Sequence, residues 1–539
     1  MTEGLLRNSA SMAVGTVASR VTGVLRDVMM TAALGFFIVA DAYSLGNTLP
    51  NIIYILVAGG ALNAVFIPQL VRHMKSDADG GQAFADRLLS AVGILLVGLS
   101  LLTVLLAPLI VDLYTPDSIG ANEYELAVAF ARLCLPQIFF YGAYTMLQQV
   151  LNARGKFAAA MFAPIANNIV AIVVFAGFIW AVRPTADSLS TLTSGQVWWL
   201  GLGTTLGVVA QAAVLLIPLA RSGYRFHLRT DWRGSGLGHA GGLALWTVGL
   251  VVANQVGYAV ITRLATSANF AAAQAGATAA GLTTYQKAHL VFILPHSVIA
   301  VSLVTALLPR LSSLAHDRLH AQMGTELDRA SRVLLAVLVP VAALLAVTAP
   351  AITELLFGYG AAGLDAARLT GEVVRVFALG LPAYSLVYVL YRAWYAMEDT
   401  RSPFVIAVVI NVLNLAVALA WYPLAPLGSK IEVLAWSYTI AYLVAAVVAH
   451  LWLARRVPGL SLARTVGLVG RLLLAAAPGA AIGWYVMSLP LGGVPAQLVA
   501  VGASWLLGLL AFVAIAPLLK VAEVREGLGL VLRRLPRRG

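Results

Sequence analysis

Residues 11–36 read SMAVGTVASRVTGVLRDVMMTAALGF, an apolar stretch that contains three charged residues, Arg20, Arg26 and Asp27. A charged side chain at the centre of a bilayer costs about 2.5–3.5 kcal/mol on insertion scales unless it faces water or a partner. Steps of three and four residues place Arg20 and Asp27 on one stripe of a helix, with Arg26 on the neighbouring stripe. Valines and alanines fill much of the remaining surface. The stretch therefore predicts a membrane helix whose polar, mostly cationic front lines a cavity.

The composition of the whole chain is that of a polytopic membrane protein. Of the 539 residues, 60% are hydrophobic and 11% are charged, and the mean hydropathy is +0.88. Apolar runs recur along the whole length, and they lack the alternation of a membrane barrel. We expect an all-α fold with about 14 transmembrane helices of about 18 residues or more. The first two are expected near residues 11–36 and 42–71.

Basic residues are concentrated in every second connection between the expected helices and in the C-terminal tail. This asymmetry follows the positive-inside rule and predicts a multi-pass protein with both termini in the cytoplasm. The net charge of +12 therefore reflects topology, and we expect the basic tail to contact membrane lipids rather than nucleic acid.

A faint internal repeat divides the chain. The matched segments are Phe66–Leu70 with Leu307–Leu311, and Leu151–Phe157 with Tyr395–Pro403. Two parallel lobes of this kind suit alternating access. We expect a six-helix lobe over 1–222, a second six-helix lobe over 223–456, and a two-helix appendage with a basic cytoplasmic tail over 457–539. The repeat also contains asparagines, which we expect to join helices by hydrogen bonds more than to contact a ligand: Asn167, Asn168, Asn411 and Asn414.

The second expected helix contains residues that favour a break. Pro50 removes a backbone donor beside Asn51, and Gly59 and Gly60 follow further along. Irregular backbone at membrane depth is tolerated where it lines a cavity, so we expect these four residues to do so. Asp41 precedes this helix, and three roles stay open for it: pairing with an arginine of the first helix, forming part of a gate, or capping a helix at the surface.

In the second lobe, Lys287 is the candidate cation for binding an anionic substrate. It follows a polar stretch rich in alanine, glycine and threonine, so a solvated position and a cavity position both stay open. The sequence contains no arrangement typical of catalysis: Cys134 is the one cysteine, the eight histidines are scattered, and a phosphate-binding GxxxxGK[ST] loop is absent. We therefore expect a transporter rather than an enzyme, with no metal site and no cofactor.

Several short motifs follow one another along most of the chain, each at one position. They are Ser19-Arg20-Val21-Thr22-Gly23, Arg26-Asp27, Asp41-Ala42, Leu49-Pro50-Asn51, Gly60-Ala61, Phe66-Ile67-Pro68, Leu356-Phe357-Gly358-Tyr359-Gly360 and Asp399-Thr400-Arg401-Ser402-Pro403. Together they closely resemble the MurJ (MviN) family of lipid II flippases, within the multidrug/oligosaccharidyl-lipid/polysaccharide exporter superfamily.

The resemblance implies transport of lipid II, the undecaprenyl-diphosphate-linked peptidoglycan precursor, from the inner to the outer leaflet of a bacterial cytoplasmic membrane. It implies a cationic central cavity, and Arg20, Arg26 and Asp41 occupy positions of the family's functional residues. Arginine suits the task because its planar fork binds phosphate oxygens bidentately. The partners implied are lipid II, membrane lipids and cell-wall synthesis proteins.

The sequence departs from the family pattern at three positions. Tyr54 and Leu290 stand where many members have arginines, and Gly59 stands where they have a glutamate. Lys287, one turn before Leu290, is the candidate substitute. Two alternatives stay open: an exporter of another polyprenyl-linked glycan or a small molecule, and a transport-inactive scaffold for envelope assembly.

Overall fold

The computed structural model describes residues 2–56, 79, 81–154, 156–185, 189, 192–231, 241–278, 280–490 and 492–524. These residues form helices joined by short connections, with no strand among them, which confirms the all-α fold. Within the described ranges, 12 helices are long and apolar enough to cross a membrane. Two more expected spans fall on α1 (Thr2–Leu34), which contains the three charges, and on α2 (Ile38–Tyr54), which has 17 residues. With these two added to the 12, the segments in the described ranges that correspond to expected membrane spans number 14, as the sequence predicts.

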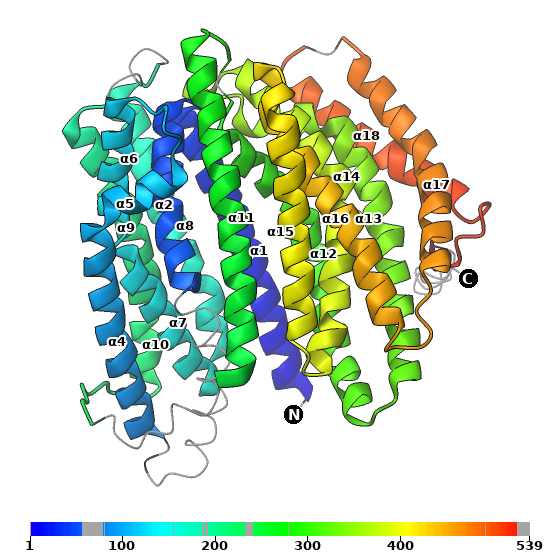
Figure 1. Cartoon of the computed structure of the whole chain (residues 1–539), viewed down its shortest axis with the longest axis horizontal. Coiled ribbons are helices and arrows are strands. Elements are labelled where there is room, and N and C mark those ends of the chain that lie inside the picture. Colours follow the sequence, from blue (N-terminus) through cyan, green and yellow to red (C-terminus); the bar gives the residue numbers. More distant parts are fainter. Residues whose placement is uncertain are drawn as a thin grey trace, which may run out of the picture. The chain divides into compact units, whose positions relative to one another are not determined.

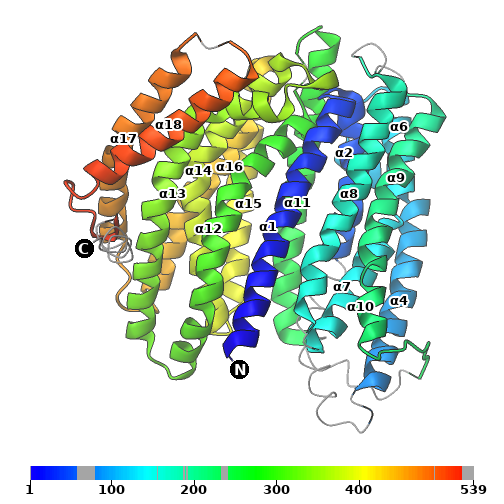
Figure 2. The ribbon, with the colours of Figure 1, turned by 180° about the vertical axis from the view of Figure 1, so that it is seen from behind.

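The first compact unit contains residues 1–275 together with 281–283 and 359–363. After α1 and α2 come α4 (Gln82–Leu105), α5 (Ala107–Tyr114), α6 (Ala121–Cys134), α7 (Gln137–Ala153), α8 (Phe157–Val182), α9 (Ser194–Ala213), α10 (Leu216–Arg221), α11 (Gly241–Gln274) and the short η3 (Gly360–Ala362). Helix α1 packs along α8, α2 packs on α6, and α8 packs on α9. Figures 1 and 2 show these helices from opposite sides.

Small residues allow the helices of this unit to approach closely. A Cβ atom added at Gly203 on α9 would lie 2.7 Å from the Val174 side chain on α8. One added at Gly46 on α2 would lie 2.7 Å from the Cβ atom of Phe130 on α6. Next to Gly46, the Tyr43 hydroxyl lies 2.7 Å from Thr204 Oγ1 and joins α2 to α9. The start of α2 is therefore held on two sides.

A Gly46→Ala variant is expected to lower the thermal unfolding midpoint, because the added methyl group would push α2 away from α6 at a cost of about 1–3 kcal/mol. Midpoints of the purified protein in detergent measure this effect. Gly98→Ala on α4 is the matched control, because a Cβ atom there would meet no described atom within 4 Å. Equal midpoints for the two variants would contradict the close packing of α2 on α6.

The second compact unit contains residues 276–280, 284–358 and 364–539. Its helices are α12 (Leu282–His316, whose first two residues belong to the first unit), α13 (His320–Phe357), α14 (Leu364–Ala396), α15 (Arg401–Trp421), α16 (Lys430–Ala454), α17 (Leu462–Ser488) and α18 (Val494–Ile515), with the short η4 (Tyr422–Leu424) and η5 (Leu427–Ser429). Helix α14 packs between α13 and α16, and α17 and α18 pack on each other and on α13 (Figure 1).

The domain boundaries expected from the sequence stay a prediction. In the structure α11 packs with the first unit, whereas the expected second lobe begins at residue 223. The two C-terminal helices form a close pair, since a Cβ atom at Gly479 on α17 would lie 2.4 Å from the carbonyl oxygen of Gly508 on α18.

Candidate functional site

The polar front of α1 holds one exposed and one anchored arginine. Arg20 is exposed and forms no hydrogen bond or ion pair with any residue that the structure describes. Arg26 retains 35% of its side-chain exposure, and its Nη2 atom lies 3.0 Å from Oδ2 of Asp27. Asp27 is buried, so the adjacent guanidinium compensates a carboxylate that would otherwise be costly at this depth. Asp27 thus forms an ion pair with its neighbour in the chain, and its role in transport stays a prediction.

Asn168 on α8 orients this pair. Its Oδ1 atom accepts a hydrogen bond from Arg26 Nη1 at 3.3 Å, while its Nδ2 donates to the Ser19 carbonyl at 3.1 Å and to Thr22 Oγ1 at 3.0 Å. Two of the five N–H donors of Arg26 are therefore used within the protein, and the others remain for a ligand. The fork is held in a fixed direction, which favours bidentate binding of an anion.

Two of the other asparagines of the repeat, Asn167 and Asn414, form the contacts between helices that were expected of them. Asn167 on α8 donates to Gln211 Oε1 of α9 at 3.3 Å, and Asn414 on α15 accepts from Ser437 Oγ of α16 at 2.8 Å. Asn411 donates to the carbonyl oxygen of Ala407 in its own helix at 2.8 Å.

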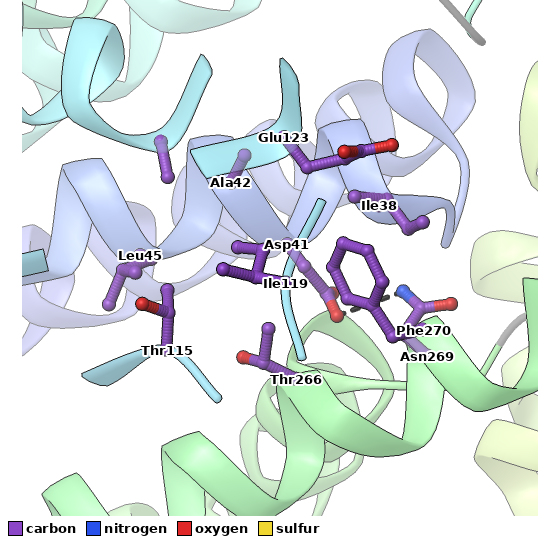
Figure 3. Close-up of a pocket in the computed structure, with 11 residues that line it drawn as sticks. Ile38, Asp41, Ala42, Leu45, Thr115, Ile119, Glu123, Thr266, Asn269 and Phe270 are labelled. Atoms are coloured by element: carbon purple, nitrogen blue, oxygen red, sulfur yellow. Dashed lines mark hydrogen bonds between the residues drawn. The ribbon is translucent and has the colours of Figure 1, made fainter. Parts of the chain in front are cut away.

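Asp41 is a buried carboxylate, 2% exposed, near the start of α2. Its Oδ2 atom accepts hydrogen bonds from Asn269 Nδ2 and from the backbone N–H of Leu282, both at 2.9 Å, and Oδ1 accepts from the backbone N–H of Thr283 at 2.7 Å. Figure 3 shows Asp41 facing Asn269 beside a narrow pocket. Leu282 and Thr283 are the first residues of α12. Asp41 therefore caps a helix far away in sequence, and no arginine contacts its carboxylate within the described chain.

Two further residues complete this contact, and sequence reasoning did not identify them. Asn269 on α11 also donates to the Phe36 carbonyl oxygen at 3.0 Å, which holds α11 against the turn between α1 and α2. Gly281 approaches Asp41 so closely that a Cβ atom there would lie 2.1 Å from Oδ2. Glycine is required at this position by the approach of the carboxylate.

The expected irregularity in the second helix lies just after Pro50 and Asn51. Pro50 is buried and Asn51 is exposed, and residues 55–56 form a π turn, a feature frequent at functional sites. Tyr54 is buried, with its ring centroid 6.2 Å from that of Tyr141. Gly59 and Gly60 lie outside the described residues.

Lys287 lies on α12 in the second unit and is 6% exposed. This burial fits neither position left open for Lys287, because both would leave its side chain in contact with water. Its role as a ligand cation stays a prediction.

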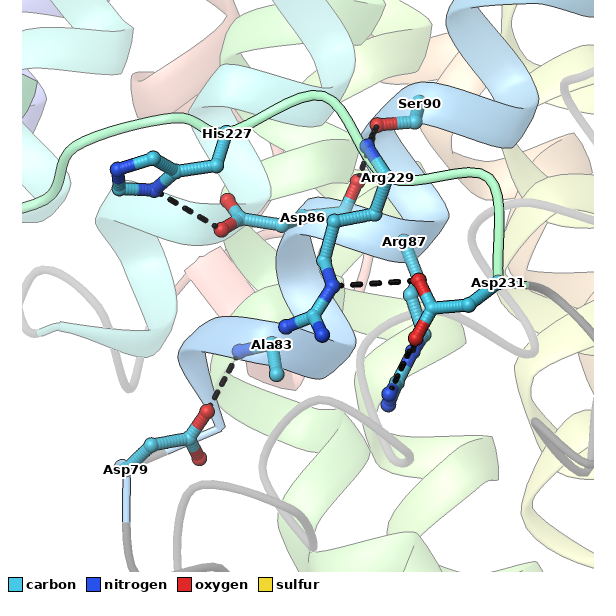
Figure 4. Close-up of polar contacts among 8 residues, drawn as sticks. All are labelled: Asp79, Ala83, Asp86, Arg87, Ser90, His227, Arg229 and Asp231. Atoms are coloured by element: carbon cyan, nitrogen blue, oxygen red, sulfur yellow. Dashed lines mark hydrogen bonds and ion pairs between the residues drawn. The ribbon is translucent and has the colours of Figure 1, made fainter.

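A second polar cluster lies on α4 in the first unit, where it anchors the segment after α10 (Figure 4). Arg87 Nη2 lies 2.7 Å from Asp231 Oδ2, and this bond lowers the pKa of Asp231 below its ordinary value. Asp86 accepts a hydrogen bond from the Tyr224 hydroxyl, and its Oδ2 lies 3.5 Å from His227 Nδ1. Each charged group of the cluster has a protein partner, so its role is structural.

Comparisons with known proteins agree with these features. The family model described as "Lipid II flippase MurJ" matches residues 30–503. A probable lipid II flippase MurJ of Rhizobium tropici is 27% identical over 424 residues, which are 78% of this chain and 76% of that protein. One from Bdellovibrio bacteriovorus is 27% identical over 465 residues, covering 85% of this chain and 83% of the relative.

Solved structures share the fold. "Lipid II flippase MurJ, inward closed conformation" has a TM-score of 0.72 at 17% identity, covering 94% of this chain and 98% of that one. An inward-facing MATE-family multidrug transporter of the MOP superfamily has a TM-score of 0.62 at 16% identity, covering 82% and 95% of the two chains. Because the family model matches most of its length, the chain belongs to the MurJ family of lipid II flippases.

Proposed function

We propose that this chain moves lipid II from the inner to the outer leaflet of a bacterial cytoplasmic membrane by alternating access. Family membership supports the substrate, and the observation that carries the proposal is the guanidinium of Arg26, which Asn168 and Asp27 hold in a fixed direction on the polar front of α1. The chain acts as a transporter without a bond-breaking step, and both of its termini lie in the cytoplasm.

Arg26 and Arg20 are proposed to supply the contacts of the first unit with the diphosphate. Arg26 presents its remaining donors from a fixed position, so it binds phosphate oxygens with little loss of side-chain entropy. Arg20 is exposed and unpaired within the described chain, so it is able to follow the anion as it enters. Lys287 supplies an auxiliary cation from the second unit.

Asp41 is proposed to act as a gate. Its carboxylate holds the first turn of α12 by two backbone hydrogen bonds and holds α11 through Asn269. Hydrogen bonds to a charged group contribute about 1.5–3 kcal/mol each, so the contact stabilises one arrangement of these helix ends strongly. Releasing it frees α12 to move, as alternating access requires.

The proposal is tested by complementing a bacterial strain depleted of its own lipid II flippase. We expect growth and normal cell shape with the wild-type chain, and lysis with well-expressed Arg20→Ala and Arg26→Ala variants. Failure of the wild type, when it reaches the membrane, would favour another polyprenyl-linked glycan as cargo, for which Tyr54 and Leu290 are the specific observations. Equal rescue by all three chains would remove the two arginines from the mechanism. Cell-wall synthesis proteins are proposed partners, and their copurification with the chain checks this.

A further inference from the structure

Four tyrosines form one stripe along α14 in the second unit. Tyr384, Tyr388, Tyr391 and Tyr395 follow one another at steps of four, three and four residues. This spacing places them on the same side of the helix. All four are partly exposed, although α14 packs between α13 and α16 and most of its other residues are buried. The stripe is therefore partly exposed and lies at the edge of the core of this unit.

Aromatic residues of two other helices extend this face. The ring centroid of Tyr442 on α16 lies 4.9 Å from that of Tyr384, and Tyr438 lies one turn away on the same helix, 4.6 Å from Tyr442. On α12, His296 lies 4.7 Å from Tyr384 and 4.9 Å from Tyr388, centroid to centroid. We call the six tyrosines the tyrosine face: Tyr384, Tyr388, Tyr391, Tyr395, Tyr438 and Tyr442.

Arg392 lies within the tyrosine face. Its guanidinium carbon is 4.2 Å from the ring centroid of Tyr388 and 5.6 Å from that of Tyr395, which are cation–π distances. Its Nε atom is buried without an acceptor, and the side chain forms no ion pair or hydrogen bond with the residues that the structure describes. Arg26, by contrast, has Asp27 beside it. The charge of Arg392 is therefore uncompensated in the second unit, which suits an anionic ligand.

The hydroxyl groups of the α14 stripe are also unused. None of its four tyrosines forms a hydrogen bond with a residue of the described ranges, and none of the hydroxyls is fully buried. Buried tyrosine hydroxyls elsewhere in the chain do have partners: Tyr43 lies 2.7 Å from Thr204 Oγ1, and Tyr224 donates to Asp86. A tyrosine hydroxyl usually finds a partner when its ring is packed. The four donors are therefore open to water or to a polar ligand.

This chemistry fits a sugar that carries a phosphate. Flat aromatic faces pack against the C–H faces of sugar rings, phenolic hydroxyls bond to sugar hydroxyls, and an unpaired guanidinium binds phosphate oxygens. A lipid tail would be matched by aliphatic side chains, and a purely structural stripe would satisfy its hydroxyls internally.

We propose that the tyrosine face binds the sugar rings of a lipid-linked glycan while Arg392 binds its diphosphate. This inference rests on the proposed function and names the part of the cargo that the second unit recognises. It also assigns a fork-shaped cation to that unit.

The test compares two ligands on the full-length chain in nanodiscs: lipid II, and undecaprenyl diphosphate, which has the same anchor and diphosphate but no sugar. Native mass spectrometry gives both dissociation constants. We expect Tyr388→Leu to weaken the binding of lipid II about tenfold and that of undecaprenyl diphosphate by a smaller factor, because loss of the ring also removes the cation–π contact of Arg392. Arg392→Gln is expected to lower the affinity for both ligands about tenfold.

Matched controls separate recognition from folding. Tyr485→Leu on α17, where the tyrosine is 63% exposed, and Arg455→Gln just after α16 should leave both dissociation constants unchanged. If Tyr388→Leu unfolds, Tyr388→Phe takes its place, because it keeps the ring and removes only the hydroxyl. We then expect the affinity for lipid II to fall about threefold and the affinity for undecaprenyl diphosphate to stay unchanged.

The outcomes are distinct. If the wild type binds lipid II and neither the Tyr388 variants nor Arg392→Gln change its affinity, the inference is overturned and the proposed function still stands. Equal wild-type affinity for the two ligands would also overturn it, because the sugar would then contribute nothing. A wild-type chain that binds neither ligand would overturn the proposed function and this inference together.

Discussion

An Arg26→Gln variant is expected to transport lipid II at least about 100-fold more slowly than the wild type. The substitution removes a bidentate contact with phosphate, in which two charge-assisted hydrogen bonds together contribute about 3 kcal/mol. Arg26→Lys keeps the charge but not the planar fork, so an intermediate rate is expected. The initial transport rates of all three chains are compared in proteoliposomes loaded with fluorescent lipid II.

Loss of Arg26 also leaves Asp27 buried without its partner, which by itself destabilises the protein. The double variant Arg26→Gln/Asp27→Asn controls for this, because it removes both charges and keeps the shape of residue 27. We expect it to regain much of the thermal stability of the wild type and to remain inactive. A double variant that transports at the wild-type rate would show that Arg26 serves only to neutralise Asp27.

An Asp41→Asn variant is expected to loosen the first turn of α12. The carboxylate accepts three N–H donors through two oxygens, whereas an amide offers one oxygen and turns an N–H₂ group toward at least one of those donors. Loss of one or two such bonds corresponds to about a tenfold change in the opening equilibrium. Labelling of an Ala280→Cys reporter with a thiol reagent measures it, in a chain whose one cysteine, Cys134, is replaced by alanine.

Gly281→Ala tests the same contact from the other side, because its Cβ atom would displace the Asp41 carboxylate. We expect faster labelling of the reporter in this variant too, together with slower transport. Asp365→Asn, an exposed acidic residue in the first turn of α14, is the matched control and should label as the wild type does. Unchanged labelling in both gate variants would show that the contact does not limit opening.

Much of the α1 site was predictable from the sequence, because its determinants are local. The cost of three charges in an apolar stretch predicted that they face water or partners, and the structure pairs Arg26 with Asp27. The expectation that asparagines join helices also applied to Asn168. Its orientation of Arg26 was not predictable, because it depends on the register of α8 against α1.

The environment of Asp41 was not predictable, since its partners are remote in sequence. Neither Asn269 nor Gly281 belongs to a motif or a periodic stripe that points to residue 41. The tyrosine stripe of α14 is visible in the spacing of the sequence, but its meaning depends on exposure and on the unpaired Arg392. Packing decides both, and a single sequence contains no direct signal of it.

The most direct test of the central claim is a measurement of lipid II reaching the outer leaflet of proteoliposomes that contain only this chain. A lipid II-cleaving enzyme added outside reports the accessible fraction over time. We expect the wild-type chain to raise the rate of exposure well above that of empty liposomes, and Arg26→Gln/Asp27→Asn to return it to the level of empty liposomes. Exposure at the empty-liposome rate with folded wild-type protein would show that the chain does not move lipid II.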